Sequence, residues 1–151
     1  MSTHKGSCHC GNVKLFAELE PILTVQCNCL SCRKVTGSIA LGAWYPEDDI
    51  TYTHEQAFVT YEYIGGSGHK MYPFFCSNCY SRVGIRIEIF PGFIGVPVGV
   101  FDDAENISPV LEAFTQSKLP FISDHGSIKE RFEGAAVKDR IAALMKALED
   151  R

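Results

Sequence analysis

The chain contains at residues 76–79 the sequence Cys76-Ser77-Asn78-Cys79, and a second pair of cysteines lies near its start in Cys8-His9-Cys10. A Cys-x-x-Cys turn brings two thiolates to one zinc ion, and structural zinc takes four protein ligands in a tetrahedron. The two pairs together supply such a ligand set. A zinc ion held in this way would link the start of the chain to its middle and would contribute directly to the free energy of folding.

A third group of cysteines lies between these pairs, in Cys27-Asn28-Cys29-Leu30-Ser31-Cys32. Because its three thiols are nearly contiguous, they can hold one ion with little loop closure. Catalytic zinc keeps three protein ligands and an exchangeable fourth position. The spacing therefore favours two zinc ions. The closed site has four ligands, Cys8, Cys10, Cys76 and Cys79, and the open site has three, Cys27, Cys29 and Cys32.

The alternative for the open site is a second structural zinc whose fourth ligand is a histidine. Histidine is a common zinc ligand. The chain has five histidines, which are His4, His9, His54, His69 and His125. None of them lies at the usual short spacing from the third cysteine group, so the open site is the preferred interpretation.

The composition is that of a soluble globular protein, with 46% hydrophobic and 21% charged residues in 151. A formal net charge of -4 disfavours a phosphate-binding surface, so we expect no nucleic-acid partner. No run approaches the ~20 apolar residues that span a bilayer, and the N-terminus lacks a signal-like apolar stretch. We therefore expect no membrane association and a cytoplasmic location. Cytoplasmic thiols stay reduced and seven cysteines is an odd number, which favours metal binding over disulfides.

Short apolar or alternating runs between residues 13 and 115 are separated by Gly, Pro, Asn and Asp, and they predict a mainly β protein of antiparallel strands. The clearest pair is a hairpin of residues 83–89 and 94–100 around the turn Phe90-Pro91-Gly92, because both runs alternate with period 2. Further strands are expected at residues 13–19, 39–45, 58–64 and 71–75.

One helix is predicted, at residues 135–148. Its apolar residues recur at helical spacing and are Val137, Ile141, Leu144, Met145 and Leu148. Its polar side is formed by Lys138, Asp139, Arg140 and Lys146. We expect the apolar face to cover the sheet, with a homodimer contact as the alternative. Residues 65–68 are expected to form a flexible hairpin tip, or else to gate a pocket. No linker or repeat is visible, so residues 1–151 are interpreted as one zinc-binding domain.

Several motifs occur in an order that is similar to that of one enzyme family. They are Gly6-Ser7-Cys8-His9-Cys10-Gly11-Asn12-Val13, Cys27-Asn28-Cys29-Leu30-Ser31-Cys32-Arg33 with Gly37, and Phe75-Cys76-Ser77-Asn78-Cys79. Weaker likenesses follow at Gly99-Val100-Phe101-Asp102-Asp103 and Ser117-Lys118-Leu119-Pro120-Phe121. The chain thus resembles the glutathione-dependent formaldehyde-activating enzyme family over residues 6–133. The resemblance implies an Mss4-like β-tent of antiparallel sheets with zinc sites and a C-terminal helix.

The resemblance also implies roles for the cysteines, with structural zinc at the four-cysteine group and catalytic or labile zinc at the three-cysteine group. The chain departs from the family pattern at four places. Asn28 and Glu112-Ala113-Phe114 stand where the family usually has histidine, Tyr80 where it has glycine, and Phe121 where it has tryptophan. None of these departures removes a cysteine, but all bear on the pocket and hence on the substrate.

The chemistry implied is the addition of a small thiol such as glutathione to a small aldehyde such as formaldehyde. Coordination to zinc deprotonates a thiol, and the resulting thiolate can attack the carbonyl carbon to give an S-hydroxymethyl adduct. In reverse the same site is a carbon–sulfur lyase. Arg33, Lys34 or Lys118 could hold the glutathione carboxylates or be surface charges. Trp44 and Tyr45 could line the pocket or fill the core.

A second class of function is open to the same sequence. An Mss4-like fold also serves as a zinc-stabilised binding or chaperone module without chemistry. An enzyme needs an accessible second zinc with an exchangeable ligand, whereas a structural module needs two closed sites. The three-cysteine group therefore separates the two hypotheses.

Overall fold

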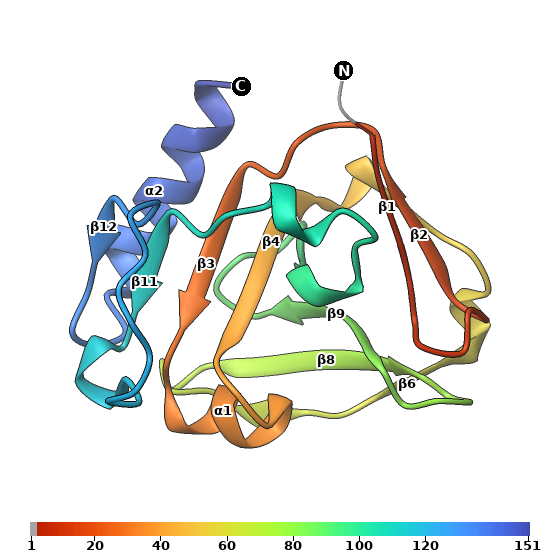
Figure 1. The fold of residues 1–151 in the computed structure, drawn as a ribbon, viewed down its shortest axis with the longest axis horizontal. Coiled ribbons are helices and arrows are strands. Elements are labelled where there is room, and N and C mark those ends of the chain that lie inside the picture. Colours follow the sequence, from red (N-terminus) through yellow and green to blue (C-terminus); the bar gives the residue numbers. More distant parts are fainter. Residues whose placement is uncertain (1–2) are drawn as a thin grey trace.

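The structure of the chain, a computed structural model, describes residues 3–151 and is built mainly from β-strands. A three-stranded sheet has the order β1-β2-β5, and a nine-stranded sheet has the order β12-β11-β3-β4-β10-β9-β8-β6, with β7 also paired to β8. In Figure 1, β3 and β4 run at a steep angle to β8, so the large sheet is strongly twisted. The small sheet lies beside it at the far end from the C-terminal helix.

The strands are short. The small sheet comprises β1 (His4–Ser7), β2 (Lys14–Ala17) and β5 (Ile50–Tyr52). The large sheet comprises β3 (Leu23–Cys27), β4 (Ala40–Pro46), β6 (Phe58–Thr60), β7 (Tyr63–Ile64), β8 (Lys70–Cys76), β9 (Arg82–Ile87), β10 (Phe93–Pro97), β11 (Leu111–Ala113) and β12 (Glu130–Arg131). Two α-helices accompany them, α1 (Leu30–Thr36) and α2 (Val137–Glu149). The 3-10 turns are η1 (Glu47–Asp49), η2 (Glu55–Ala57), η3 (Val98–Val100), η4 (Ala104–Asn106) and η5 (Thr115–Ser117).

The large sheet separates two hydrophobic cores, as the alternation along β4 shows. Ala43 and Tyr45 belong to the core shared with the small sheet, where Leu15 of β2 packs. Trp44 points to the other side, into a core that includes Leu144 of α2. Successive side chains of a strand face opposite sides of a sheet, which explains the division. Trp44 and Tyr45 are the two residues that could line a pocket or fill the core. Tyr45 is fully buried, so it is a core residue.

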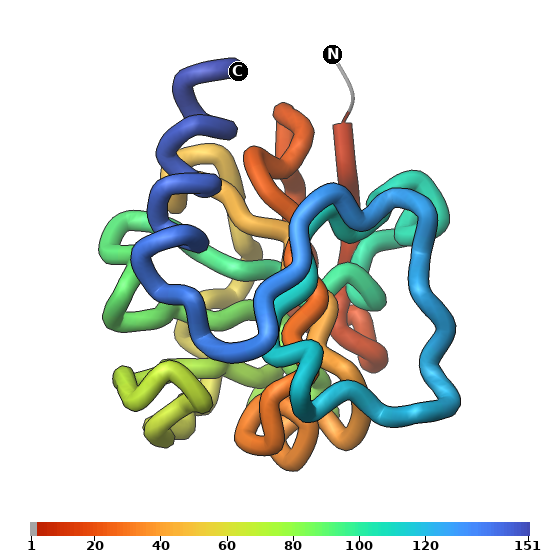
Figure 2. Tube along the Cα trace, turned by 90° about the vertical axis from the view of Figure 1, so that its left-hand side faces the viewer, coloured from red at the N-terminus to blue at the C-terminus, as the bar shows by residue number. Residues whose placement is uncertain are grey.

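The mainly β fold with a C-terminal helix is confirmed, and the predicted hairpin exists as β9 and β10. Gly92 in its turn has φ of 84°, a left-handed conformation that glycine adopts without a steric cost. Helix α2 spans Val137–Glu149, and its Leu144 belongs to the core on this side of the sheet. Figure 2 shows this helix near the C-terminus, along one side of the molecule. Among residues 3–151, no helix has the length and apolar composition that a membrane span requires.

Three features of the fold differ from the prediction. The strand expected at residues 58–64 is divided into β6 and β7. The pairing is not antiparallel throughout, because β11 runs parallel to both β3 and β12. Helix α1, directly after the third cysteine group, was not expected, since it is only seven residues long and ends in the β-branched Val35 and Thr36.

Candidate metal centres

The seven cysteines form two groups at opposite parts of the large sheet. In the first group, Cys8 and Cys10 follow β1, Cys76 is the last residue of β8, and Cys79 lies in the turn after it. The four Sγ atoms all lie within 4.8 Å of one another. The Sγ of Cys10 is 3.6 Å from that of Cys8 and 3.8 Å from that of Cys76. Zinc–sulfur bonds of ~2.3 Å in a tetrahedron require sulfur separations of ~3.8 Å, so the group fits one ion.

Backbone N–H groups point at the sulfurs of this first group. The N–H of Val13 donates to Cys8 Sγ at 3.2 Å, and that of Asn78 donates to Cys76 Sγ at 3.4 Å. The hydroxyl of Ser81, 3.2 Å from the sulfur, lowers the pKa of Cys79 to about 5. Such hydrogen bonds orient metal-binding sulfurs and stabilise their negative charge. Burial raises the pKa of Cys8 to about 11, so metal binding here must also displace a proton.

The second group lies where β3 ends and α1 begins. Cys27 is the last residue of β3, Cys29 is the N-cap of α1, and Cys32 lies in the first turn of that helix. Their Sγ atoms all lie within 4.8 Å of one another. The N–H of Cys32 donates to Cys29 Sγ at 3.3 Å, so the cap itself fixes one sulfur. The helix ends at Gly37, whose φ is 82°.

The sulfurs of this second group shift one another's pKa values. Hydrogen bonds from the thiols of Cys27 and Cys32 lower the pKa of Cys29 to about 2, and the backbone N–H of Gly66 adds to the effect. The same contacts, together with burial, raise the pKa of Cys27. The three sulfurs therefore titrate as one coupled set. A divalent ion binding there would release the remaining protons.

The turn at residues 65–68 packs against this cluster and is not a free hairpin tip. A Cβ added to Gly66 would lie 2.9 Å from Cys29 Cβ and 2.9 Å from the ring of Phe114. Glycine at this position therefore allows the turn to approach the sulfurs closely. The turn therefore lies directly against Cys29 of the cluster.

No histidine joins either group among residues 3–151. His4 lies in the other core, where its ring nitrogens contact Glu20 at 2.9 Å and Asp103 at 2.8 Å. His69 lies 3.5 Å from Glu88. The histidine-completed second site is therefore not supported by the positions of these rings, and within residues 3–151 no histidine, aspartate, glutamate or further cysteine joins Cys27, Cys29 and Cys32.

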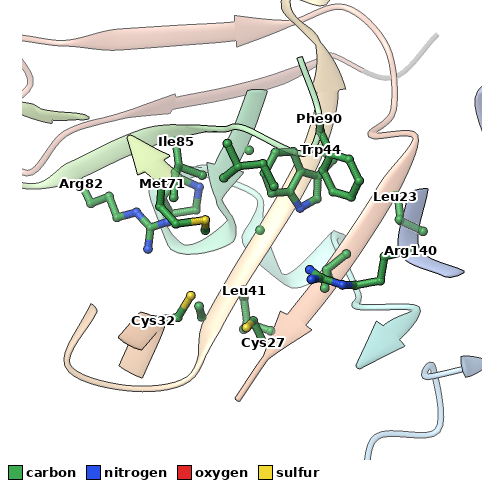
Figure 3. A pocket seen from close by; sticks show the side chains of 16 residues that line it. Leu23, Cys27, Cys32, Leu41, Trp44, Met71, Arg82, Ile85, Phe90 and Arg140 are labelled. Atoms are coloured by element: carbon green, nitrogen blue, oxygen red, sulfur yellow. The ribbon is translucent and has the colours of Figure 1, made fainter. Parts of the chain in front are cut away.

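A mostly apolar pocket lies beside Cys27 and Cys32, as Figure 3 shows from close by. Its volume is about 70 Å³. Trp44 and Phe90 form one wall with their rings packed edge to face at a centroid distance of 5.5 Å. Trp44 is thus a pocket residue, whereas its neighbour Tyr45 is not.

The cations at this pocket are not those proposed from the sequence. Arg82 of β9 and Arg140 of α2 line it, and Figure 3 shows their guanidinium groups reaching in from opposite sides. Arg140, which was assigned to the polar side of the helix, is only 9% exposed. Neither Arg33 nor Lys34 lines the pocket. No pattern in the sequence distinguishes Arg82 or Arg140, because sequence alone does not separate an arginine that faces inward from one that faces solvent.

Lys118 is already paired within the protein. Its Nζ lies 2.9 Å from Glu112 Oε1 and 2.5 Å from Asp124 Oδ1. The carboxylate of Glu112 is almost completely buried. Lys118 therefore compensates a carboxylate of this chain, and it is not free to hold one of a substrate.

Two of the departures from the family pattern are partners in space. The side-chain amide of Asn28 donates to Glu112 Oε1 at 2.9 Å, and that of Gln26 donates to the same oxygen at 3.2 Å. Asn28 stands between Cys27 and Cys29, so Glu112 fixes the backbone that carries two of the sulfurs. Spacing could not reveal this contact, because 84 positions separate the two residues and they meet only through the parallel pairing of β3 and β11.

The other two departures, Tyr80 and Phe121, do not line the pocket beside the second cysteine group. Tyr80, at φ of 59° and 69% exposed, lines an outer groove that continues from the pocket. Phe121 is 75% exposed and lines neither the pocket nor the groove. Of Tyr80 and Phe121, only Tyr80 is placed to contact a ligand in the outer groove.

Comparison with known proteins gives the class of protein. Residues 3–117 match the family described as glutathione-dependent formaldehyde-activating enzyme, and the chain therefore belongs to that family. Its structure is similar to the crystal structure of a Rhodobacter sphaeroides protein, with a TM-score of 0.50 and 20% sequence identity over 85% of this chain and 98% of that chain. This likeness shows a shared fold. No curated protein matches the chain significantly.

Proposed function

We propose that this protein is a zinc-dependent carbon–sulfur lyase, similar to S-hydroxymethylglutathione synthase, that adds a small thiol to a small aldehyde. One observation carries the proposal. Three thiols converge with no fourth protein ligand, and they do so beside a pocket, whereas the other four thiols form a complete tetrahedral set. The family membership agrees with this type of reaction.

The donor sets fit zinc. Clusters of three or four cysteine sulfurs select soft or borderline ions with tetrahedral geometry, and zinc is the common one. In this proposal Cys8, Cys10, Cys76 and Cys79 hold a structural ion, and Cys27, Cys29 and Cys32 hold a catalytic or labile ion. When bound at the second group, zinc would supply an acid strong enough to keep an incoming thiol deprotonated at neutral pH.

The pocket residues provide a dry space for the reaction. The volume of about 70 Å³ is roughly half of an engineered ~150 Å³ cavity that binds benzene, so an aldehyde and the sulfur end of a thiol fit, but a tripeptide does not. The outer groove, about 360 Å³, shares Leu41, Arg82 and Pro97 with the pocket. It offers room for the remainder of a thiol such as glutathione.

The reaction balances without a further reactant. The thiolate sulfur forms a bond to the carbonyl carbon, the π electron pair of the C=O bond moves to oxygen, and that oxygen takes a proton. In the reverse direction the carbon–sulfur bond breaks and the aldehyde leaves. Seven reduced cysteines suit a reducing compartment such as the cytoplasm, where such a thiol is abundant.

The test is the rate of adduct formation from glutathione and formaldehyde, followed by exchange NMR. Wild type is expected to accelerate the exchange, and Cys32→Ser is expected to return it to the uncatalysed rate, because only two sulfurs would then hold the second ion. Ser31→Ala serves as the matched control, since it alters the same helical turn without removing a sulfur.

Equal rates for wild type and Cys32→Ser, with every thiol and aldehyde tried, would contradict the proposed enzyme. If glutathione alone fails while smaller thiols react, the enzyme class stands, and Asn28 and Tyr80 become the residues that changed its substrate.

A further inference from the structure

The two arginines that line the pocket form no salt bridge with a carboxylate among residues 3–151. The buried Nε of Arg82 has no hydrogen-bond partner at all. Arg140 donates from Nε to the backbone oxygen of Ala135 at 2.5 Å and lies 5.9 Å from the centroid of the Phe114 ring. Uncompensated charges in the interior cost several kcal/mol each, so two of them around one pocket require an anionic partner.

Among residues 3–151, the titratable groups that interact electrostatically with these guanidinium groups are three thiols and one phenol. Cys27 and Cys32 interact electrostatically with both arginines, Cys29 interacts with Arg140, and Tyr63 with Arg82. The hydroxyl of Tyr63 lies 3.7 Å from Cys32 Sγ. Both arginines are therefore placed toward the three-cysteine cluster.

The charges balance only when a further anion is present. Three thiolates and one divalent ion carry a net charge of minus one, whereas the two guanidinium groups carry plus two. A single additional anion in the pocket makes the set neutral. Water or a neutral ligand in the fourth position leaves one buried positive charge without a partner.

We infer that Arg82 and Arg140 are charge-compensating residues that make this pocket selective for an anionic ligand, so that the substrate thiol binds as its thiolate. This inference rests on the proposed function and names the charge state of its substrate. Arg82 and Arg140 then also balance the negative charge that moves during the addition step. The negative charge passes from sulfur to the aldehyde oxygen as the new carbon–sulfur bond forms, and the guanidinium group of Arg82, which lines the pocket, can stabilise that oxygen.

The test uses the full-length protein loaded with cobalt in place of zinc, because thiolate binding to cobalt changes its visible absorption. Two ligands are titrated, 2-mercaptoethanol as the source of an anion and imidazole as a neutral ligand. Removing one unit charge within ~12 Å of an anion, at an effective dielectric constant of ~20, is expected to weaken binding at least about ten-fold. Arg82→Gln and Arg140→Gln should each weaken 2-mercaptoethanol binding by this factor and leave imidazole binding within about two-fold.

The matched control is Arg86→Gln. Arg86 lies on the same strand as Arg82, but it is half-exposed and pairs with Glu47 at 2.7 Å. The Arg86→Gln variant should leave the dissociation constants of 2-mercaptoethanol and imidazole unchanged. Arg82→Lys and Arg140→Lys keep the charge and should retain most of the thiolate binding, which a merely structural role of the guanidinium would not explain. Arg82→Met and Arg140→Met provide a second pair if the glutamine variants fail to fold.

Equal weakening of thiol and imidazole binding, or thiol binding that survives both substitutions, would overturn this inference alone. The proposed function would then stand on the adduct assay. If wild type binds no thiol at its cobalt sites, both the inference and the proposed function are overturned. No aldehyde is present in the titration, so thiol binding is measured separately from turnover.

Discussion

Cys76→Ser is expected to leave the protein unfolded under conditions in which Cys29→Ser folds normally. The first cysteine group joins residues near 8 to residues near 76 and fits a complete zinc site. Structural zinc in small peptides contributes ~10–16 kcal/mol of binding free energy, which is as large as the whole ~5–15 kcal/mol stability of a domain. The loss of one buried ligand there removes much of that contribution.

Cys29→Ser is an informative comparison with Cys76→Ser, because serine is itself a favoured N-cap residue. The Sγ of Cys29 accepts the N–H of Cys32 at the start of α1, and a serine oxygen can accept the same bond. The helix should therefore remain while the second metal is lost. Circular dichroism, thermal unfolding and zinc content per chain measure the two variants. Equal loss of thermal stability in both would contradict distinct structural and labile sites.

Glu112→Ala is expected to lower the free energy of unfolding by ~3–5 kcal/mol, the usual cost of removing one member of a buried ion pair. Its carboxylate accepts hydrogen bonds from Asn28 and Gln26 and pairs with Lys118 and Arg131. Two buried amides would lose their acceptor, and Lys118 would lose its buried partner. Because Asn28 lies between two sulfurs, the variant should also lose its second metal more readily to a chelator. Denaturant unfolding and zinc release measure the two effects.

Asp124→Ala is the matched control for this prediction. Asp124 pairs with the same Lys118, but its side chain is 73% exposed, so its loss should cost less than ~1 kcal/mol. Similar costs for Glu112→Ala and Asp124→Ala would contradict the role assigned to the buried network.

The contribution of Glu112 should also depend on pH in a defined direction. Burial acts to raise its pKa, but hydrogen bonds from Lys118 and Asn28 outweigh burial and hold the pKa below its usual value. The stabilisation is therefore complete above the unfolded-state pKa of ~4.3 and is lost as the pH falls through it toward the folded-state pKa. The stability difference between wild type and Glu112→Ala should be constant from pH 6 to 8 and should shrink at pH 4.

Local patterns in the sequence predicted much of this architecture. Alternation of period 2 predicted β9 and β10, and the helical spacing of apolar residues predicted α2. The cysteine spacing separated two groups, and the structure brings together the same residues in each. That these groups bind zinc, and that residues 1–151 form one domain, stay predictions.

The parts that sequence reasoning missed depend on contacts between distant segments. Strand β11 has three residues and is parallel to β3, so neither its existence nor the meeting of Asn28 with Glu112 follows from local periodicity. The inward positions of Arg82 and Arg140 depend on how β9 and α2 pack around the cysteines. Arginine side chains are usually exposed, so the residue type alone predicts that Arg82 and Arg140 face solvent.

The arrangement of one closed and one open zinc site is tested most directly by the mean number of sulfur ligands per zinc, measured by X-ray absorption on protein with both sites filled. One closed four-sulfur site and one open three-sulfur site predict a mean of about 3.5 sulfurs, with one oxygen or nitrogen ligand completing the coordination of the second zinc. Addition of glutathione should raise the mean to about 4. A mean of 4 before any thiol is added, or a value of about 3.5 that glutathione does not change, would contradict the open, thiol-binding site.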